Sequence, residues 1–217
     1  PLRQLTESQF AAWERDGYCV LPGIVPLDLC ANAATTIRTF VGADDSRPES
    51  WYTNTQDIYD ATLAPRPVHG PCGMVQLYHH ATLWALRQHP AIHACFADVY
   101  GTERLYVTCD RAHFKPPQSA AHPAWSDAGP VHSGLHWDVD VKNTPIPFSV
   151  QGVVYLEDTR AETGALRVVP SCRGRLGAID DSEAVAVEGA AGSLVLFASV
   201  WTSSADGVGN RPRVRRR

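Results

Sequence analysis

Residues 131–140 (VHSGLHWDVD) carry the residue types of a metal site. One histidine and one aspartate, His136 and Asp138, stand two positions apart on either side of Trp137. On an extended strand, side chains two positions apart point to the same face, about 6.6 Å apart along the backbone. An imidazole and a carboxylate that converge in this way supply two of the three protein ligands of a facial non-haem Fe(II) site. The spacing predicts metal ligation by His136 and Asp138, and a hydrogen-bonded pair without metal is the alternative.

The second half of the sequence contains the strands that must position these ligands. Short runs rich in β-branched and aromatic residues are separated by Gly, Pro or acidic turns, which is typical of strands. The expected strands cover residues 105–109, 131–138, 148–156, 166–169, 184–187 and 194–200. A β half of this kind closes as a sandwich or jelly roll.

The first hundred residues are mainly helical. Thr6 and Gln9 have capping-box spacing, and Asp16-Gly17 ends that helix before a short buried strand at 18–21. Apolar residues at helical spacing predict further helices over 27–40 and 81–100, the latter interrupted before Pro90. His79 and His80 stand at the opening of that last helix, as capping or packing residues. Residues 43–72 have no sustained period and are expected to be irregular.

Together these elements predict an α+β protein of one domain over residues 1–217. Residues 1–100 form a mainly helical cover and residues 101–217 a mainly β core, with N-terminal helices packed on it. The length of 217 residues and the 44% of hydrophobic residues fit one domain with a substantial core.

The charge distribution excludes several classes of partner. The net charge is −4 although five arginines stand among the last seven residues, so the rest of the chain is acidic and offers no nucleic-acid surface. Lysine occurs only twice and no apolar run approaches membrane-spanning length, so no membrane association is expected. The six cysteines form no CxxC pair and are expected to be reduced, buried thiols. These features favour a cytoplasmic protein, and the oligomeric state cannot be predicted from them.

Segments along nearly the whole chain resemble the phytanoyl-CoA dioxygenase family of Fe(II)- and 2-oxoglutarate-dependent oxygenases. They occur in the family's order: TESQFAAWERDGYCVLP at 6–22, YHHATLWALRQHP at 78–90, DRAHFKPP at 110–117, LHWDVD at 135–140, GVVYLEDTRAETGALRVVP at 152–170, GSLVLF at 192–197 and RPR at 211–213.

The resemblance implies a double-stranded β-helix, a jelly roll of the cupin type, that encloses Fe(II). It places an arginine, Arg213 with Arg211 as the near rival, against the distal carboxylate of the cosubstrate 2-oxoglutarate. A planar guanidinium suits that bidentate contact. Arg111 and Lys115 stand where the family contacts the cosubstrate. The implied reaction uses O2 to oxidise a small organic substrate, with succinate and CO2 as co-products.

The sequence departs from the family at the second iron-binding histidine. That residue is expected at Thr202 or Ser203, but all nine histidines lie at or before position 136. Thr202, Ser203, Asp206 or water are the alternatives for the third ligand. His132 lies on the same strand face as His136, but four extended residues separate the two by about 13 Å.

Two functions therefore remain open. The first is a 2-oxoglutarate-dependent oxygenase. The second is a redox-inactive relative, such as a cofactor-free isomerase or a binding protein, which the missing histidine favours. A further explanation for the missing histidine is that the C-terminal stretch of this sequence is altered or cut short.

Overall fold

The structure is a computed structural model that describes residues 2–52, 73–117, 119–122, 135–137, 142, 148–171 and 180–200. The chain divides into two compact units. Unit 1 comprises Pro1–Leu27, Gln88–Tyr106 and Leu135–Arg217, and unit 2 comprises Asp28–Arg87 and Val107–Gly134. The single domain expected from the chain length stays a prediction.

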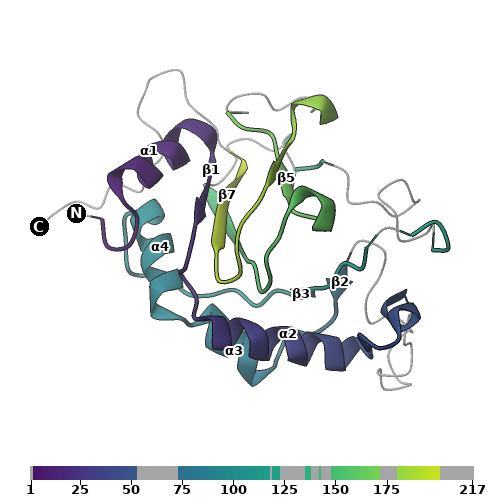
Figure 1. The fold of residues 1–217 in the computed structure, drawn as a ribbon. Helices are drawn as coiled ribbons and strands as arrows, with labels where there is room; N and C mark the ends of the chain where they lie inside the picture. Colours follow the sequence, from purple (N-terminus) through teal and green to yellow (C-terminus); the bar gives the residue numbers. More distant parts are fainter. Residues whose placement is uncertain are drawn as a thin grey trace, which may run out of the picture. The chain divides into compact units, whose positions relative to one another are not determined.

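A three-stranded antiparallel sheet lies at the centre of unit 1 (Figure 1). Its order is β1 (Tyr18–Leu21), β7 (Leu194–Val200) and β4 (Ser149–Val154). The middle strand β7 therefore pairs on both edges, so that its Val195 lies opposite a valine of β1 and a valine of β4. Leu194, Val195 and Leu196 are almost completely buried, as expected of a continuous apolar run in a strand covered on both faces.

One face of this sheet packs against a β-hairpin. The hairpin consists of β5 (Leu166–Val168) and β6 (Val185–Val187), which pair antiparallel. Tyr155, at the end of β4, is buried with Val187 and Val195, and residues of all five strands pack around this cluster. The hydroxyl of Tyr155 donates to the Val187 carbonyl (2.6 Å) and accepts from the Leu166 N–H (3.2 Å). Tyr155 therefore ties the hairpin to the sheet through one side chain.

The other face of the sheet packs against helix α4 (Pro90–Tyr100). Gly152 of β4 leaves space for the ring of Phe96, because a Cβ at this position would lie 2.9 Å from Phe96 Cζ. The Tyr100 hydroxyl accepts from the Val150 N–H (3.0 Å), and the Tyr100 ring meets Phe148 edge to face. The helix is thus fixed to β4 by both shape and hydrogen bonding.

Helix α1 (Glu7–Asp16) precedes β1 and is closed at both ends as its sequence requires. Thr6 and Gln9 form the expected capping box, and Gly17 ends the helix in the left-handed conformation (φ 78°). The segment before α1 is held by Asp98 of α4, whose buried carboxylate accepts the backbone N–H groups of residues 3, 4 and 5 at 2.7–2.9 Å. A charged acceptor with three donors is well satisfied although it is buried.

In its described residues, unit 2 has two α-helices and a short two-stranded sheet. Helix α2 (Leu27–Val41) buries Cys30, Ala33, Ile37 and Val41, which recur at helical spacing. Strands β2 (Met74–Val75) and β3 (Ala112–His113) pair antiparallel, and α3 (Ala81–Arg87) follows β2.

Arg87, the last residue of α3, holds two segments of unit 2. Its guanidinium donates to the carbonyls of Tyr78 and Asp110 and lies 5.2 Å from the centre of the Trp84 ring. Three 3-10 helices complete the regular structure that is described; they span Pro48–Tyr52, Ala161–Thr163 and Asp181–Glu183.

The structure confirms an α+β fold with antiparallel sheets. It confirms the helices over 27–40 and 81–100, including the interruption before Pro90, and the strands within 148–156, 166–169, 184–187 and 194–200. Among the described residues, no helix has both the length and the apolar character needed to cross a bilayer.

The expected strand over 105–109 is wrong. Residues 104–111 have no regular structure, and the strand of this region is β3, three residues further on. The Leu105 N–H bonds the nearby Glu103 carbonyl (2.8 Å), so it is not available to a neighbouring strand. Tyr106 is 89% exposed and Val107 43%, so the alternating pattern does not bury one face.

Replacing Tyr155 with phenylalanine should destabilise unit 1. Burial raises the pKa of the Tyr155 hydroxyl, which stays protonated and able to donate at neutral pH. Tyr155→Phe leaves the Val187 carbonyl and the Leu166 N–H without their partner, at an expected cost of about 1–3 kcal/mol. Urea unfolding measures this cost, and Tyr106→Phe, at an exposed tyrosine, is the matched control. Equal free energies of unfolding for the two variants would contradict the role of the hydroxyl.

Candidate functional site

His136 belongs to unit 1 and is exposed, with Leu135 and Trp137 half-buried beside it. These three residues have no regular secondary structure, so the strand expected over 131–138 is wrong at these positions. The physical reason is that alternation of apolar and polar residues predicts only an extended backbone. A strand also needs regular hydrogen bonds to a neighbouring strand. Asp138 lies outside the described residues. That its side chain shares a face with His136 stays a prediction.

Arg111 and Lys115, the predicted cosubstrate contacts, belong to unit 2 and flank β3. Arg111 Nε lies 3.4 Å from Asp110 Oδ1, and the same oxygen accepts the Arg111 backbone N–H at 2.6 Å. Both side chains are exposed, so this ion pair orients Arg111 only weakly. The contact of Arg111 with a cosubstrate stays a prediction. Lys115 is half-buried.

The segment after β3 is fixed to the 3-10 helix at Pro48–Tyr52 by aromatic stacking. The rings of Tyr52 and His122 stack with their centres 4.0 Å apart, and His122 Nε2 lies 2.7 Å from Glu49 Oε2. The Tyr52 hydroxyl also donates to the Pro117 carbonyl at 2.7 Å. These three contacts position the backbone on the C-terminal side of Lys115.

The remaining predicted site residues lie outside the described residues. They are Asp138 and Arg213, the rival Arg211, the alternative third ligands Thr202, Ser203 and Asp206, and His132. Their assignments to iron and 2-oxoglutarate stay predictions.

The donor types at these positions fit an iron site in part. An imidazole at His136 and a carboxylate at Asp138 are ordinary ligands of Fe(II), and two protein donors leave the other positions to oxygen ligands. Within the part of the chain that the structure describes, no three His, Cys, Asp or Glu side chains come together as a metal site. The described residues therefore contribute His136 alone to the expected donor set.

Cys109, His79 and Trp84 lie together in unit 2, and the residue types alone did not predict this cluster. This thiol is exposed, in contrast to the expectation of buried cysteines, and it lies 4.0 Å from His79 Nε2 and 3.5 Å from the Tyr78 carbonyl. The His79 ring stacks loosely on Trp84, with the ring centres 6.0 Å apart. The one sequence signal was the pair His79-His80 before a helix.

His80 caps α3, as expected for one of the two histidines at this helix start. Its Nδ1 accepts the backbone N–H of Thr82 at 3.3 Å and lies 2.9 Å from the Thr82 hydroxyl. A side-chain acceptor for the second N–H of a helix is the ordinary geometry of an N-cap.

The sequence matches the model of the phytanoyl-CoA dioxygenase (PhyH) family over residues 13–202, most of its length. The chain belongs to this family. This result confirms the resemblance to the family, and the matched residues include LHWDVD at 135–140. RPR at 211–213 lies outside the match, and the roles of single residues are not tested by it.

Two similar solved structures are those of the non-haem alpha-ketoglutarate-dependent epimerase SnoN from nogalamycin biosynthesis. The first is 18% identical, with a TM-score of 0.49, and covers 89% of this chain and 72% of the other. The second, SnoN in complex with Fe3+, alpha-ketoglutarate and nogalamycin RO, is 16% identical, with a TM-score of 0.49 and coverages of 89% and 73%. Both likenesses are too remote to place a residue of this chain. Among curated proteins, no match is found.

The cysteines of the PhyH chain should differ strongly in reactivity. Burial raises the pKa of the Cys19 and Cys95 thiols to about 12, whereas Cys109 is exposed. Because the thiolate is the reactive form, N-ethylmaleimide should modify Cys109 at least about 100-fold faster than either buried thiol. Timed labelling with peptide mass spectrometry measures the three rates, and labelling in denaturant is the control. Equal rates in the folded protein would contradict the burial of Cys19 and Cys95.

Proposed function

We propose that this PhyH-family chain is a non-haem Fe(II)- and 2-oxoglutarate-dependent oxygenase that acts on a small organic molecule. The observation that carries the proposal is the family match over residues 13–202, which includes His136 and Asp138 in the LHWDVD segment. In this proposal the fold closes as a double-stranded β-helix, and His136 and Asp138 hold the metal.

The overall reaction balances without further reactants. 2-Oxoglutarate, O2 and a substrate C–H bond give succinate, CO2 and a substrate C–OH bond, so that one oxygen atom enters each of succinate and the product. Bound iron supplies the redox chemistry of this oxidation.

The chain's own residues bind and orient the cosubstrate. Arg213 pairs with the distal carboxylate of 2-oxoglutarate, and Arg111 and Lys115 add positive charge for this dianion.

A second function is favoured by one specific observation, the absence of a histidine after position 136. A serine or threonine hydroxyl is neutral and binds Fe(II) less well than imidazole, so the donor set is weaker than two histidines and one carboxylate. The alternative is a redox-inactive relative, an isomerase or binding protein that uses the same fold without iron.

Metal binding tests the two ligands. Mn2+ titration of the full chain, followed by electron paramagnetic resonance in the presence of 2-oxoglutarate, should show one site. His136→Ala and Asp138→Ala should each weaken Mn2+ binding at least about tenfold, since loss of even an outer-shell partner costs that much. His93→Ala is the control, because the His93 ring bonds the Glu103 carbonyl in unit 1. Unchanged affinity in both ligand variants, or no Mn2+ binding at all, would contradict the oxygenase proposal and favour the redox-inactive alternative.

Restoring the family's histidine tests the third ligand. Thr202→His and, separately, Ser203→His should show which position faces the metal, since one of the two should raise Fe(II) affinity at least about tenfold. An anaerobic titration with Fe(II) and 2-oxoglutarate, read from the visible charge-transfer band, measures this affinity. Failure of both variants would mean that the site is rearranged rather than lacking one side chain.

A further inference from the structure

Arg87 connects two segments of unit 2 that lie side by side at β2 and β3. The pairing of these strands ends after two residue pairs, and the Leu77 N–H then bonds the Val75 carbonyl (2.8 Å) within its own segment. Beyond this point, the guanidinium of Arg87 donates to the carbonyls of Tyr78 in one segment and Asp110 in the other. A guanidinium has five N–H donors in one plane, so a single side chain can satisfy both carbonyls.

The contact with Asp110 fixes the peptide group that joins Asp110 to Arg111. The carbonyl of this group accepts from Arg87, and its N–H, which belongs to Arg111, donates to Asp110 Oδ1 (2.6 Å). Both polar atoms of the peptide group are therefore engaged, whereas the ion pair between the exposed side chains of Asp110 and Arg111 contributes little. Because a peptide group is planar, these two hydrogen bonds fix the plane from which the Arg111 side chain begins.

The backbone after Arg111 is fixed by β3. Both residues of β3 pair with β2, and the Phe114 N–H bonds the Gly73 carbonyl (2.8 Å). Arg87 provides the corresponding contact on the preceding side. The backbone is thus held on both sides of Arg111, and the half-buried Arg87 is the side chain that completes this arrangement.

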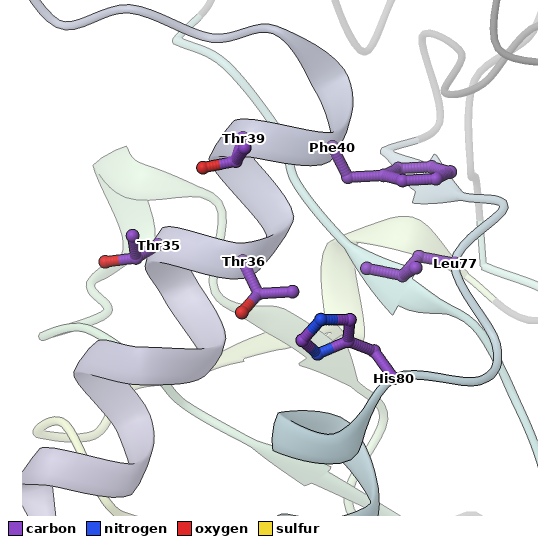
Figure 2. Close-up of a pocket in the computed structure, with 6 residues that line it drawn as sticks. All are labelled: Thr35, Thr36, Thr39, Phe40, Leu77 and His80. Atoms are coloured by element: carbon purple, nitrogen blue, oxygen red, sulfur yellow. The ribbon is translucent and has the colours of Figure 1, made fainter.

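Helix α3 can hold Arg87 in place because its first turn is fixed to α2. The Thr82 hydroxyl of α3 donates to Thr36 Oγ1 of α2 (3.2 Å). Figure 2 shows Thr36 on α2, with the ring of His80, the residue before α3, pointing toward this helix. At the other end of α3, the Arg87 guanidinium lies 5.2 Å from the centre of the Trp84 ring, a cation–π contact. Arg87 therefore extends from a helix that is fixed at its start and packs on that helix at its end.

We propose that Arg87 is a positioning residue for 2-oxoglutarate, because it fixes the backbone before Arg111, which in turn contacts a carboxylate of the cosubstrate. This inference rests on the proposed function, in which Arg111 adds positive charge for the dianion. Both terminal nitrogens of Arg87 donate to backbone carbonyls, so Arg87 acts through Arg111 and not by its own contact with the cosubstrate. A backbone that is fixed in advance reduces the freedom that Arg111 loses on binding, and this raises the affinity.

The affinity for 2-oxoglutarate tests the role of Arg87. The full chain is loaded with Mn2+ and titrated with 2-oxoglutarate in an isothermal titration calorimeter. Arg87→Lys keeps the positive charge but cannot bridge two carbonyls in one plane, so it should weaken 2-oxoglutarate binding about three- to tenfold, the range of one lost hydrogen bond. The affinity for Mn2+ itself should not change, because the proposed metal ligands belong to unit 1. Arg47→Lys, at an exposed arginine of unit 2 that pairs with Asp44, is the matched control and should bind as the natural protein does.

A double-mutant cycle separates positioning from a general loss of structure. Arg111→Ala should weaken 2-oxoglutarate binding by itself, and the addition of Arg87→Lys should then cause no further loss, since Arg87 acts through Arg111. A merely structural role would weaken binding equally in both backgrounds. Arg87→Gln, whose amide can donate to only one of the two carbonyls, is a second variant and should give the same pattern.

Four results would overturn the inference while the natural protein still binds 2-oxoglutarate. They are unchanged binding by Arg87→Lys, unchanged binding by Arg111→Ala, equal losses from Arg87→Lys with and without Arg111, and a parallel loss of Mn2+ affinity. Each of these results leaves the proposed function standing. If the natural protein loaded with Mn2+ binds no 2-oxoglutarate, the proposed function and the role of Arg87 both fail.

Discussion

The pairing of β7 with two strands from distant parts of the chain is the constraint on which unit 1 depends. β1 lies within the first 21 residues and β4 begins only at residue 149, and both hydrogen-bond to β7. Val195 and Leu196 point to opposite faces of β7, so one strand contributes to the core on both sides. The β5–β6 hairpin then packs on the Val195 face and α4 on the face of Gly152. A change in the register of β7 by one residue would exchange these two faces and disrupt both layers.

Most of these elements could be predicted because local signals agree with the tertiary structure. The Thr6 capping box, Gly17 and Pro90 fixed helix ends through backbone chemistry that acts within a few residues. The prediction of a strand at 105–109 is wrong, because an alternating pattern does not show whether a neighbouring strand is present. Tyr106 of this segment stays exposed. Likewise, the apolar character of Cys109 says nothing about whether the fold leaves it at the surface.

The candidate site could be predicted from the sequence only in part. His136 and Asp138 follow from residue type and spacing, and the family match covers them, but the backbone at His136 is irregular rather than a strand. The contact between α2 and the start of α3 joins residues 46 positions apart, as the Thr36–Thr82 hydrogen bond shows. Spacing along the sequence carries no signal for such a contact, although the position of His80 before a helix correctly indicated a cap.

Three of the seven histidines that the structure describes have local hydrogen-bond partners, which limits the supply of metal ligands. His80 caps a helix, His93 bonds a carbonyl and His122 pairs with Glu49, so these rings are engaged by nearby groups. With no histidine beyond position 136, a metal held by His136 and Asp138 must complete its coordination from oxygen donors unless His132 or another distant ring reaches it.

Exchange of one imidazole for an oxygen ligand changes which metal is preferred. Imidazole favours Fe(II), whereas carboxylate, hydroxyl and water suit harder cations such as Mn2+ and Mg2+. In the proposed iron site, the departure at Thr202 and Ser203 would therefore act on metal selectivity as well as on affinity. A lower preference for Fe(II) would reduce oxygenase chemistry first and leave the binding of a carboxylate cosubstrate by arginine largely intact, because that contact depends on charge and geometry rather than on the metal.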